Sequence, residues 1–260
     1  MYNPSEQITV TTANTQMGKA IRSGGLQAVA NSDVLLLQEV QMPPNELAEH
    51  VKELGLLAVS IAGHFGLAIA IKPEHKVTDS KKVTLQKQGP LGRAIGFHGS
   101  ERWDDTKFRL RGRGLLVVAL KTAKGSHVTV ATTHPTVPIK FLSRRKQINA
   151  AADALADVTD PLVLAGDMNH WPGPGRLDRK MRGNAHLAAV NLGTVPTFDV
   201  ARNNYAWLGK LSQIGLNPNG QLDAMLYRGA IHPNHTELVD ISTDHQAIST
   251  TFTLARLVLA

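Results

Sequence analysis

Hydrophobic and polar positions follow two different periods along this chain, and each period favours one kind of secondary structure. β-Branched residues alternate over Ile8–Thr12, which predicts a strand. The uninterrupted apolar run Val34–Leu37, inside Asp33–Val40, is typical of a strand buried on both faces. Apolar residues recur at helical spacing over Lys19–Ala30 and Phe141–Ala156, so these two segments are predicted to be helices.

The rest of the chain continues this mixture. A third helix is expected at Asn45–Leu54, directly after a pair of prolines. Further strands are expected at Leu56–Ile61, Gly66–Ile71, Gly114–Leu120, His127–Thr133, Pro161–Gly166, Leu222–Tyr227, Glu237–Ile241 and Gln246–Leu254. The segment from Pro73 to Gly114 is rich in Lys, Arg and Gly and is expected to be irregular. Because helices alternate with strands while hairpins also occur, the pattern indicates mixed β-sheets covered by helices.

The composition suits a globular protein and narrows its chemistry. The chain has 260 residues, 42% of them hydrophobic and 19% charged, which supplies an ordinary core and allows one large domain or two small ones. It has no cysteine, and this excludes disulfides, Cys-ligated zinc and a Cys nucleophile. It also has neither the G-x-S-x-G motif of serine hydrolases nor a P-loop, so those two chemistries have no support.

The charge balance is basic. The chain has 28 Lys and Arg against 21 Asp and Glu, a formal net charge of +7. This balance favours polyanions such as nucleic acid or an anionic membrane surface, although a basic surface can also serve solubility alone. Met1–Gln7 lacks the basic and apolar regions of a signal peptide, and no apolar run approaches the roughly 20 residues of a membrane span. We therefore expect a cytoplasmic monomer without a membrane span.

Several predicted strands end in, or begin with, a polar residue that can take part in chemistry. These residues are Asn14, Glu39, His134, Asp167, Asn169, Asp223 and the pair Asp244-His245. Most have an ordinary explanation when taken alone, as a solvated strand end or a turn former. Asp223 is harder to dismiss, because a carboxylate inside an apolar strand needs a partner. Together they offer the oxygen ligands of a Mg²⁺ site with a base beside it, which is what phosphodiester hydrolysis requires.

At these residues the sequence resembles the endonuclease/exonuclease/phosphatase superfamily, which includes DNase I, exonuclease III-type enzymes, sphingomyelinases and inositol polyphosphate phosphatases. The matching pieces are Thr12-Ala13-Asn14-Thr15-Gln16, Leu37-Gln38-Glu39-Val40, Thr133-His134-Pro135, Gly166-Asp167-Met168-Asn169, Gln221-Leu222-Asp223 and Thr243-Asp244-His245. They occur in the family's order and span nearly the whole chain, and each of them alone is a weak match. The resemblance implies a single domain over residues 1–260. Its expected fold is a four-layer α/β sandwich, in which two mixed β-sheets pack face to face with helices outside.

The resemblance also implies a role for each residue. Glu39 would be the chief ligand of Mg²⁺ (or Mn²⁺), helped by Asn14 and Asp244. His245 would be the catalytic histidine, oriented by Asp223, and Asp167 would position or deprotonate the attacking water. Asn169 and His134 would bind the scissile phosphate, and Thr197 would be a further phosphate contact.

The sequence departs from the subfamily patterns at three places. Exonuclease III-type enzymes usually carry a Tyr-containing stretch where this chain has Thr133-His134-Pro135, a form closer to DNase I, the sphingomyelinases and the phosphatases. The stretch typical of abasic-site endonucleases is replaced by Gln221-Leu222-Asp223-Ala224. Gln41 stands where DNase I-like enzymes often place an Arg that enters the minor groove. The resemblance therefore leaves the subfamily open.

Outside these motifs, a Gly-rich basic segment is the best candidate for binding a phosphate backbone. Its cations are Arg109, Arg111 and Arg113, and Gly112 and Gly114 lie among them, which suits a loop over a cleft. His232 and His235 could pair on a metal, but in a segment with Pro and Asn they are expected to lie in a solvated loop.

The leading hypothesis is a nuclease that hydrolyses DNA, and RNA as a second substrate, with Mg²⁺ or Mn²⁺. A phosphoesterase acting on a lipid or inositol phosphate is the first alternative. A catalytically silent scaffold that binds DNA or another protein is the alternative from a different class, and the complete set of Glu39, Asp167 and His245 argues against it.

Overall fold

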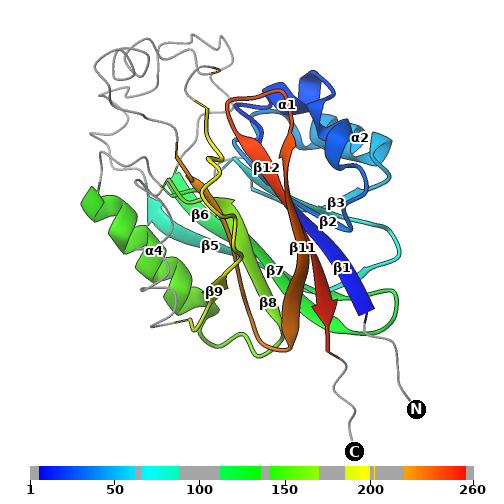
Figure 1. Cartoon of the computed structure of the whole chain (residues 1–260), viewed down its shortest axis with the longest axis vertical. Helices are drawn as coiled ribbons and strands as arrows, with labels where there is room; N and C mark the ends of the chain where they lie inside the picture. The colour runs from blue at the N-terminus through cyan, green and yellow to red at the C-terminus, as the bar shows by residue number, and fades with distance from the viewer. Residues whose placement is uncertain are drawn as a thin grey trace, which may run out of the picture.

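The computed structural model describes residues 6–62, 66–87, 112–135, 141–169, 185–199, 202 and 220–255. In this part of the chain the strands form two six-stranded sheets, with the orders β11-β12-β1-β2-β4-β3 and β5-β6-β7-β8-β10-β9 (Figure 1). The first sheet contains β1 (Glu6–Asn14), β2 (Val34–Gln38), β3 (Leu57–Ala62), β4 (Leu67–Ile71), β11 (Ile231–Asp240) and β12 (Gln246–Leu254). The second contains β5 (Lys76–Lys87), β6 (Gly112–Lys121), β7 (His127–Thr133), β8 (Leu162–Asp167), β9 (Ala188–Ala189) and β10 (Asp223–Arg228). The described helices are α1 (Lys19–Arg22), the 3₁₀ helix η1 (Gly25–Val29), α2 (Pro44–Glu53) and α4 (Phe141–Leu155).

Both sheets are mixed, and each has one parallel pair at its centre. In the first sheet β1 runs parallel to β2, and in the second β7 runs parallel to β8. The remaining pairs within each sheet are antiparallel. The two parallel pairs face each other across the core, where β1 contacts β8 and β2 contacts both β7 and β8.

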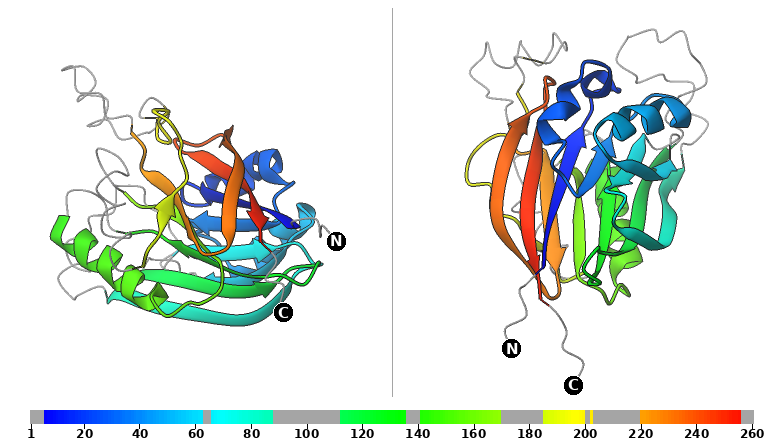
Figure 2. Two further views of the ribbon diagram at one scale, coloured as in Figure 1. Left: turned by 60° about the horizontal axis from the view of Figure 1, so that its bottom comes forward. Right: turned by 90° about the vertical axis from the view of Figure 1, so that its right-hand side faces the viewer.

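The sheets pack face to face, and their outer faces are covered by helices (Figure 2). Leu36 and Val130 belong to the core between the sheets, whereas Leu35 and Leu37 point outward and pack with side chains of α2. Because both faces of β2 are covered, its side chains alternate between two apolar layers, which explains the uninterrupted apolar run in the sequence. On the far side, α4 packs against the outer face of β8. This arrangement confirms the expected sandwich of two mixed sheets with helices outside.

One predicted helix is wrong in its length, because the structure has two short helices in its place. The segment Lys19–Ala30 is divided into α1 and η1, with Gly24 between them at φ 75°, a left-handed conformation. Gly25 follows, and a Cβ there would lie 2.2 Å from the carbonyl oxygen of Ile241. The close approach of this loop to the chain after β11 therefore interrupts the helix, and the helical spacing of the apolar residues did not reveal it.

A second expectation is wrong in the segment from Pro73 to Gly114. It contains β5, a 12-residue strand at the edge of the second sheet. Most of its described side chains are exposed, and Val77, Val83 and Leu85 are only partly buried. The strand therefore lacks a clear apolar alternation, and lysines such as Lys81 and Lys82 protect the exposed edge from pairing with another chain.

The loop expected around His232 and His235 is also wrong, because both residues lie within β11. This strand starts six residues before the predicted Glu237 and has an irregularity between Pro233 and His235. Both histidines pair with residues of β12 and are exposed, so their expected solvation is confirmed although they lie in a strand. Among the described residues, no helix is long and apolar enough to cross a membrane.

Candidate active site

Four of the predicted site residues lie at the carboxyl ends of the two central parallel pairs. Asn14 is the last residue of β1 and Glu39 directly follows β2, while His134 follows β7 and Asp167 is the last residue of β8. Strands of a parallel pair end at the same edge of their sheet, and here the two pairs also face each other. The packing of the sheets therefore brings these side chains together at one rim.

Two further residues reach this rim from antiparallel strands. Asp223 is the first residue of β10 and pairs directly with Asp167. His245 precedes β12, which runs antiparallel to β1, so the start of β12 lies beside the end of β1. Residues separated by more than 200 positions in sequence, such as Asn14 and His245, are thereby gathered at one site.

The Asp167 carboxylate lies at the centre of the site and is 2% exposed. Asn14 Nδ2 donates to its Oδ2 at 3.0 Å, and the Asn169 backbone N–H donates to its Oδ1 at 2.8 Å. His134 Nε2 lies 3.3 Å from Oδ2, and His245 Nε2 lies 3.9 Å from the same atom. Burial raises the pKa of Asp167, but the two imidazoles and the Asn169 N–H outweigh burial and lower it to about 2. Asp167 is therefore ionised at neutral pH.

His245 and Asp223 form a buried pair beside this carboxylate. His245 Nδ1 is 2.8 Å from Asp223 Oδ2, and the Asp223 backbone N–H donates to Thr197 Oγ1 at 3.1 Å. The ring of Phe198 meets the imidazole edge to face, with centroids 5.1 Å apart. Burial lowers the pKa of His245, but Asp223 and Asp167 outweigh burial and raise it to about 10, while burial raises the pKa of Asp223. The pair fixes the imidazole through Nδ1 and leaves Nε2 facing Asp167.

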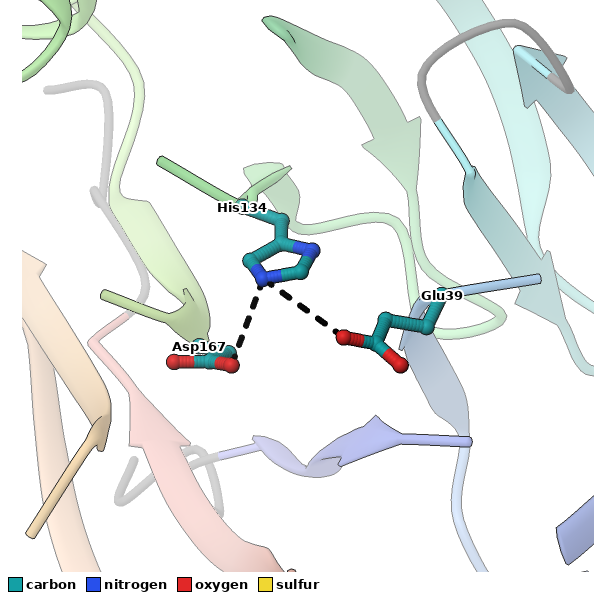
Figure 3. Close-up of side chains that lie close together, drawn as sticks. All are labelled: Glu39, His134 and Asp167. Atoms are coloured by element: carbon teal, nitrogen blue, oxygen red, sulfur yellow. Dashed lines mark ion pairs between the residues drawn. The ribbon is translucent and has the colours of Figure 1, made fainter. Parts of the chain in front are cut away.

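Glu39 and His134 complete the group (Figure 3). The imidazole of His134 lies between the two carboxylates, with Nε2 3.9 Å from Glu39 Oε1 and 3.3 Å from Asp167 Oδ2. The backbone N–H of Met17 donates to Glu39 Oε2 at 3.2 Å. Glu39 is half-buried, whereas His134 and Asp167 are almost fully buried.

Left-handed backbone conformations concentrate at this rim. Gln16, Met17, Glu39 and Asn169 all have φ between 47° and 57°. Such conformations cost non-glycine residues on the order of 1–3 kcal/mol each and persist where the surrounding structure holds them, often at functional sites. At Glu39 the turn directly follows a fully buried strand, and its carboxylate faces His134 across the rim.

The donor set fits a hard divalent cation. The ligand atoms of Glu39, His134 and Asp167 lie within 4.8 Å of one another, and those of Asp167, Asp223 and His245 form a second such group. Carboxylate oxygens dominate these groups, and the chain has no cysteine, which suits Mg²⁺ or Mn²⁺ rather than a soft metal. Among the described residues, the groups of three or more possible ligands do not include Asp244.

The remaining predicted site residues are Asn169, Thr197 and the three arginines of the basic segment. Asn169 Nδ2 donates to the Pro135 carbonyl at 3.0 Å, which uses one of its two amide hydrogens, and Arg144 donates to the Asn169 carbonyl. Thr197 is fully buried behind Asp223. Arg113 contacts His134, and Arg109 and Arg111 lie outside the described residues.

Two further residues, Gln38 and Phe198, support the site, and the sequence pattern assigned neither of them a role. The ring of Phe198 packs against the imidazole of His245. Gln38 is fully buried, and its Nε2 donates to Thr12 Oγ1 at 3.0 Å and, across the core, to Thr132 Oγ1 at 2.8 Å. It therefore ties the two sheets together directly below Glu39 and His134. In the sequence, this role is indicated only by the position of the polar Gln38 at the end of the apolar run Val34–Leu37.

Comparison with solved structures shows the same fold in several proteins. The catalytic domain of human nocturnin matches with a TM-score of 0.66 and 15% identity, over 98% of this chain and 97% of that chain. An endonuclease/exonuclease/phosphatase from Bacteroides vulgatus matches with a TM-score of 0.67 and 13% identity, over 96% and 100% of the two chains. Truncated TDP2 from Caenorhabditis elegans matches with a TM-score of 0.61 and 15% identity, over 95% and 97%.

A search of curated protein sequences finds no match. Residues 11–245 match the sequence model of the endonuclease/exonuclease/phosphatase family, a range that begins before Asn14 and ends on His245. The match thus includes every residue gathered at the rim. Members of the family are phosphoesterase hydrolases that depend on divalent metal. This chain, with its two-sheet sandwich and its rim of carboxylates and histidines, belongs to the endonuclease/exonuclease/phosphatase family.

Proposed function

We propose that this protein is a divalent-metal-dependent phosphodiesterase and that its substrate is nucleic acid, with DNA as the principal form. The observation that carries the proposal is the ionised Asp167 carboxylate held between two imidazoles, with Glu39 beside it. A phosphodiesterase needs a group that orients water, donors for the phosphate oxygens and ligands for a cation, and this rim offers all three.

Glu39 would hold Mg²⁺ or Mn²⁺ as the chief ligand, with Asn14 and Asp244 as the other protein ligands. Asn14 is suitably placed because its Nδ2 donates to Asp167, which directs Oδ1 away from that carboxylate, where it accepts the Gln16 N–H at 3.0 Å. The bound cation would supply charge stabilisation for the phosphate oxygens.

The side chains at the rim would then orient the attacking water and bind the phosphate oxygens. Asp167, with its pKa of about 2, accepts a hydrogen bond from the attacking water and orients it. His245, held by Asp223, keeps a proton on Nε2 and donates it as a hydrogen bond to a phosphate oxygen. His134 and the second amide hydrogen of Asn169 are the further donors.

The preference for nucleic acid rests on charge. The net charge of +7 favours a polyanion, and counterion release from the phosphate backbone would strengthen binding. The same fold occurs in an inositol polyphosphate 5-phosphatase domain, at 14% identity and a TM-score of 0.59, so a small phosphate ester is the substrate to be tested against DNA.

The test is a substrate panel with matched variants. Supercoiled plasmid, single-stranded DNA, an abasic duplex, sphingomyelin and an inositol polyphosphate are each incubated with Mg²⁺, with Mn²⁺ and with EDTA. We expect cleavage of DNA with metal, none in EDTA, and a nearly complete loss in Glu39→Gln. Glu53→Gln, on the exposed side of α2, is the control and should behave as the unmodified protein. Turnover of the inositol phosphate without any DNA cleavage would refute the nuclease and keep the phosphoesterase.

A salt titration separates binding from chemistry. Neutralising Arg109 and Arg111 together should weaken DNA binding. It should also reduce the slope of log K against log salt by about two, because each phosphate contact contributes nearly one to that slope. The rate at saturating DNA should remain, because the residues of the rim are unchanged. An unaltered slope would exclude these two arginines as backbone contacts.

A further inference from the structure

Arg113 approaches His134 from behind the active site. It lies near the start of β6, which is paired with β7, and His134 directly follows β7. Its Nη1 is 3.2 Å from His134 Nδ1 and 3.3 Å from the His134 carbonyl oxygen. One side chain thus contacts both the ring and the backbone of the same histidine.

This contact determines which ring nitrogen carries a proton. A guanidinium has donors and no acceptor, so it bonds to Nδ1 only when Nδ1 has a free lone pair. The proton of the ring must then be on Nε2, so in this tautomer His134 is a donor and not a metal ligand through that nitrogen. That nitrogen faces Asp167 Oδ2 at 3.3 Å and Glu39 Oε1 at 3.9 Å, two acceptors that match an N–H and would repel a lone pair.

We propose that Arg113 is a positioning residue that fixes His134 as the Nε2–H tautomer, so that this N–H is available to a phosphate oxygen of the substrate. The role rests on the proposed phosphodiesterase function and differs from the direct substrate contact predicted for Arg113 from the sequence. Without Arg113, only Asp167 and Glu39 favour the ring proton on Nε2, and Nδ1 is free to take that proton. A ring that does so presents a lone pair on Nε2 to an anionic substrate. The wrong tautomer of a catalytic histidine is known to reduce rates strongly.

The first measurement is spectroscopic and independent of activity. Protein labelled with ¹⁵N at histidine is studied by long-range ¹H–¹⁵N correlation, which distinguishes a protonated from an unprotonated ring nitrogen. The His134 resonances are identified by their loss in His134→Asn. We expect Nδ1 to be unprotonated in the unmodified protein and to gain proton occupancy in Arg113→Met. Arg113→Lys keeps a donor and should preserve the original tautomer.

The second measurement is kinetic. Arg113→Met should lower kcat about 10–100-fold, the range typical for removing a hydrogen-bond partner that orients a side chain of a metal site, with KM nearly unchanged. Arg113→Lys should recover part of this loss, because an ammonium donates but lacks the fixed fork of the guanidinium. A small phosphodiester serves as substrate alongside DNA, so the measurement does not depend on DNA being the true substrate.

Arg228→Met is the matched control. Arg228 donates to the carbonyl oxygens of Ala185, Leu155 and Val158, away from the rim, and its loss should lower stability without changing the His134 spectrum.

Three results would overturn the proposal. The first is a proton on His134 Nδ1 in the unmodified protein, a result that requires no variant to fold. The second is an unchanged tautomer in Arg113→Met. The third is a higher KM and a flatter salt dependence with kcat unchanged, which would make Arg113 a substrate contact. If no phosphodiester is cleaved at all, the function fails while the spectrum still decides the tautomer.

Discussion

Gly166 precedes Asp167, and its replacement by alanine should disturb both stability and catalysis. The residue has φ 153°, a region that is essentially restricted to glycine. A Cβ at this position would lie 2.1 Å from the carbonyl oxygen of Thr133, while real Cβ contacts almost never fall below 3.0 Å. Because the opposing atom is backbone, β8 and β7 must move apart by about 1 Å to accept it.

The expected cost has two parts. Backbone strain contributes about 1–3 kcal/mol, and overpacking contributes about 1–3 kcal/mol more. Unfolding free energy should therefore fall by roughly 2–6 kcal/mol. At about 2–4 °C per kcal/mol for a protein near this size, Tm should fall by roughly 4–24 °C. Circular dichroism during thermal unfolding measures this shift.

The same displacement should affect the active site. Movement of β8 against β7 changes the 3.3 Å separation of Asp167 Oδ2 from His134 Nε2, and a misplacement of about 1 Å can cost about 10²-fold in rate. Rates are compared well below the Tm of each variant. Gly55→Ala is the control, since Gly55 has φ 74° and a Cβ there would meet nothing within 4 Å, so it reports backbone strain alone. If Gly166→Ala lowers Tm and rate no more than Gly55→Ala does, a Cβ at position 166 does not clash with the Thr133 carbonyl as expected.

Three further experiments test the site and its support. His245→Ala should lower kcat at least about 10²-fold, and Asp223→Asn should be impaired in the same assay; a normal rate in either would contradict the role of the 2.8 Å pair. Mg²⁺ or Mn²⁺ should raise the Tm of the unmodified protein and not that of Glu39→Gln, because a ligand that binds only the folded state stabilises it; equal shifts measured by differential scanning fluorimetry would place the cation elsewhere. Gln38→Met should lower the free energy of unfolding by about 1–3 kcal/mol in urea titrations, since it leaves the buried hydroxyl of Thr132 without its donor; an unchanged midpoint would show that the bridge between the sheets contributes little.

The sequence determined the class of fold and most of its elements, because burial imposes a period on the side chains. The apolar run at Val34–Leu37 and the helical spacing at Phe141–Ala156 both correspond to real elements, β2 and α4. Edge strand β5 was missed because its exposed side chains carry no such period, and the helix at Lys19–Ala30 was overestimated because its interruption depends on contact with Ile241.

The order and identity of the polar motifs also placed the candidate site at the strand ends. Only the tertiary structure decided how those residues meet, because the contacts join strands from two sheets. Asp223 reaches Asp167 through antiparallel pairing, and His245 reaches the same rim through the pairing of β12 with β1. The contact between Arg113 and His134 likewise depends on the register of β6 and β7, and no sequence period records it. Local periodicity therefore fixes which segments are strands and helices, whereas the partners of each polar side chain are decided by long-range packing, which brings distant residues within hydrogen-bonding distance.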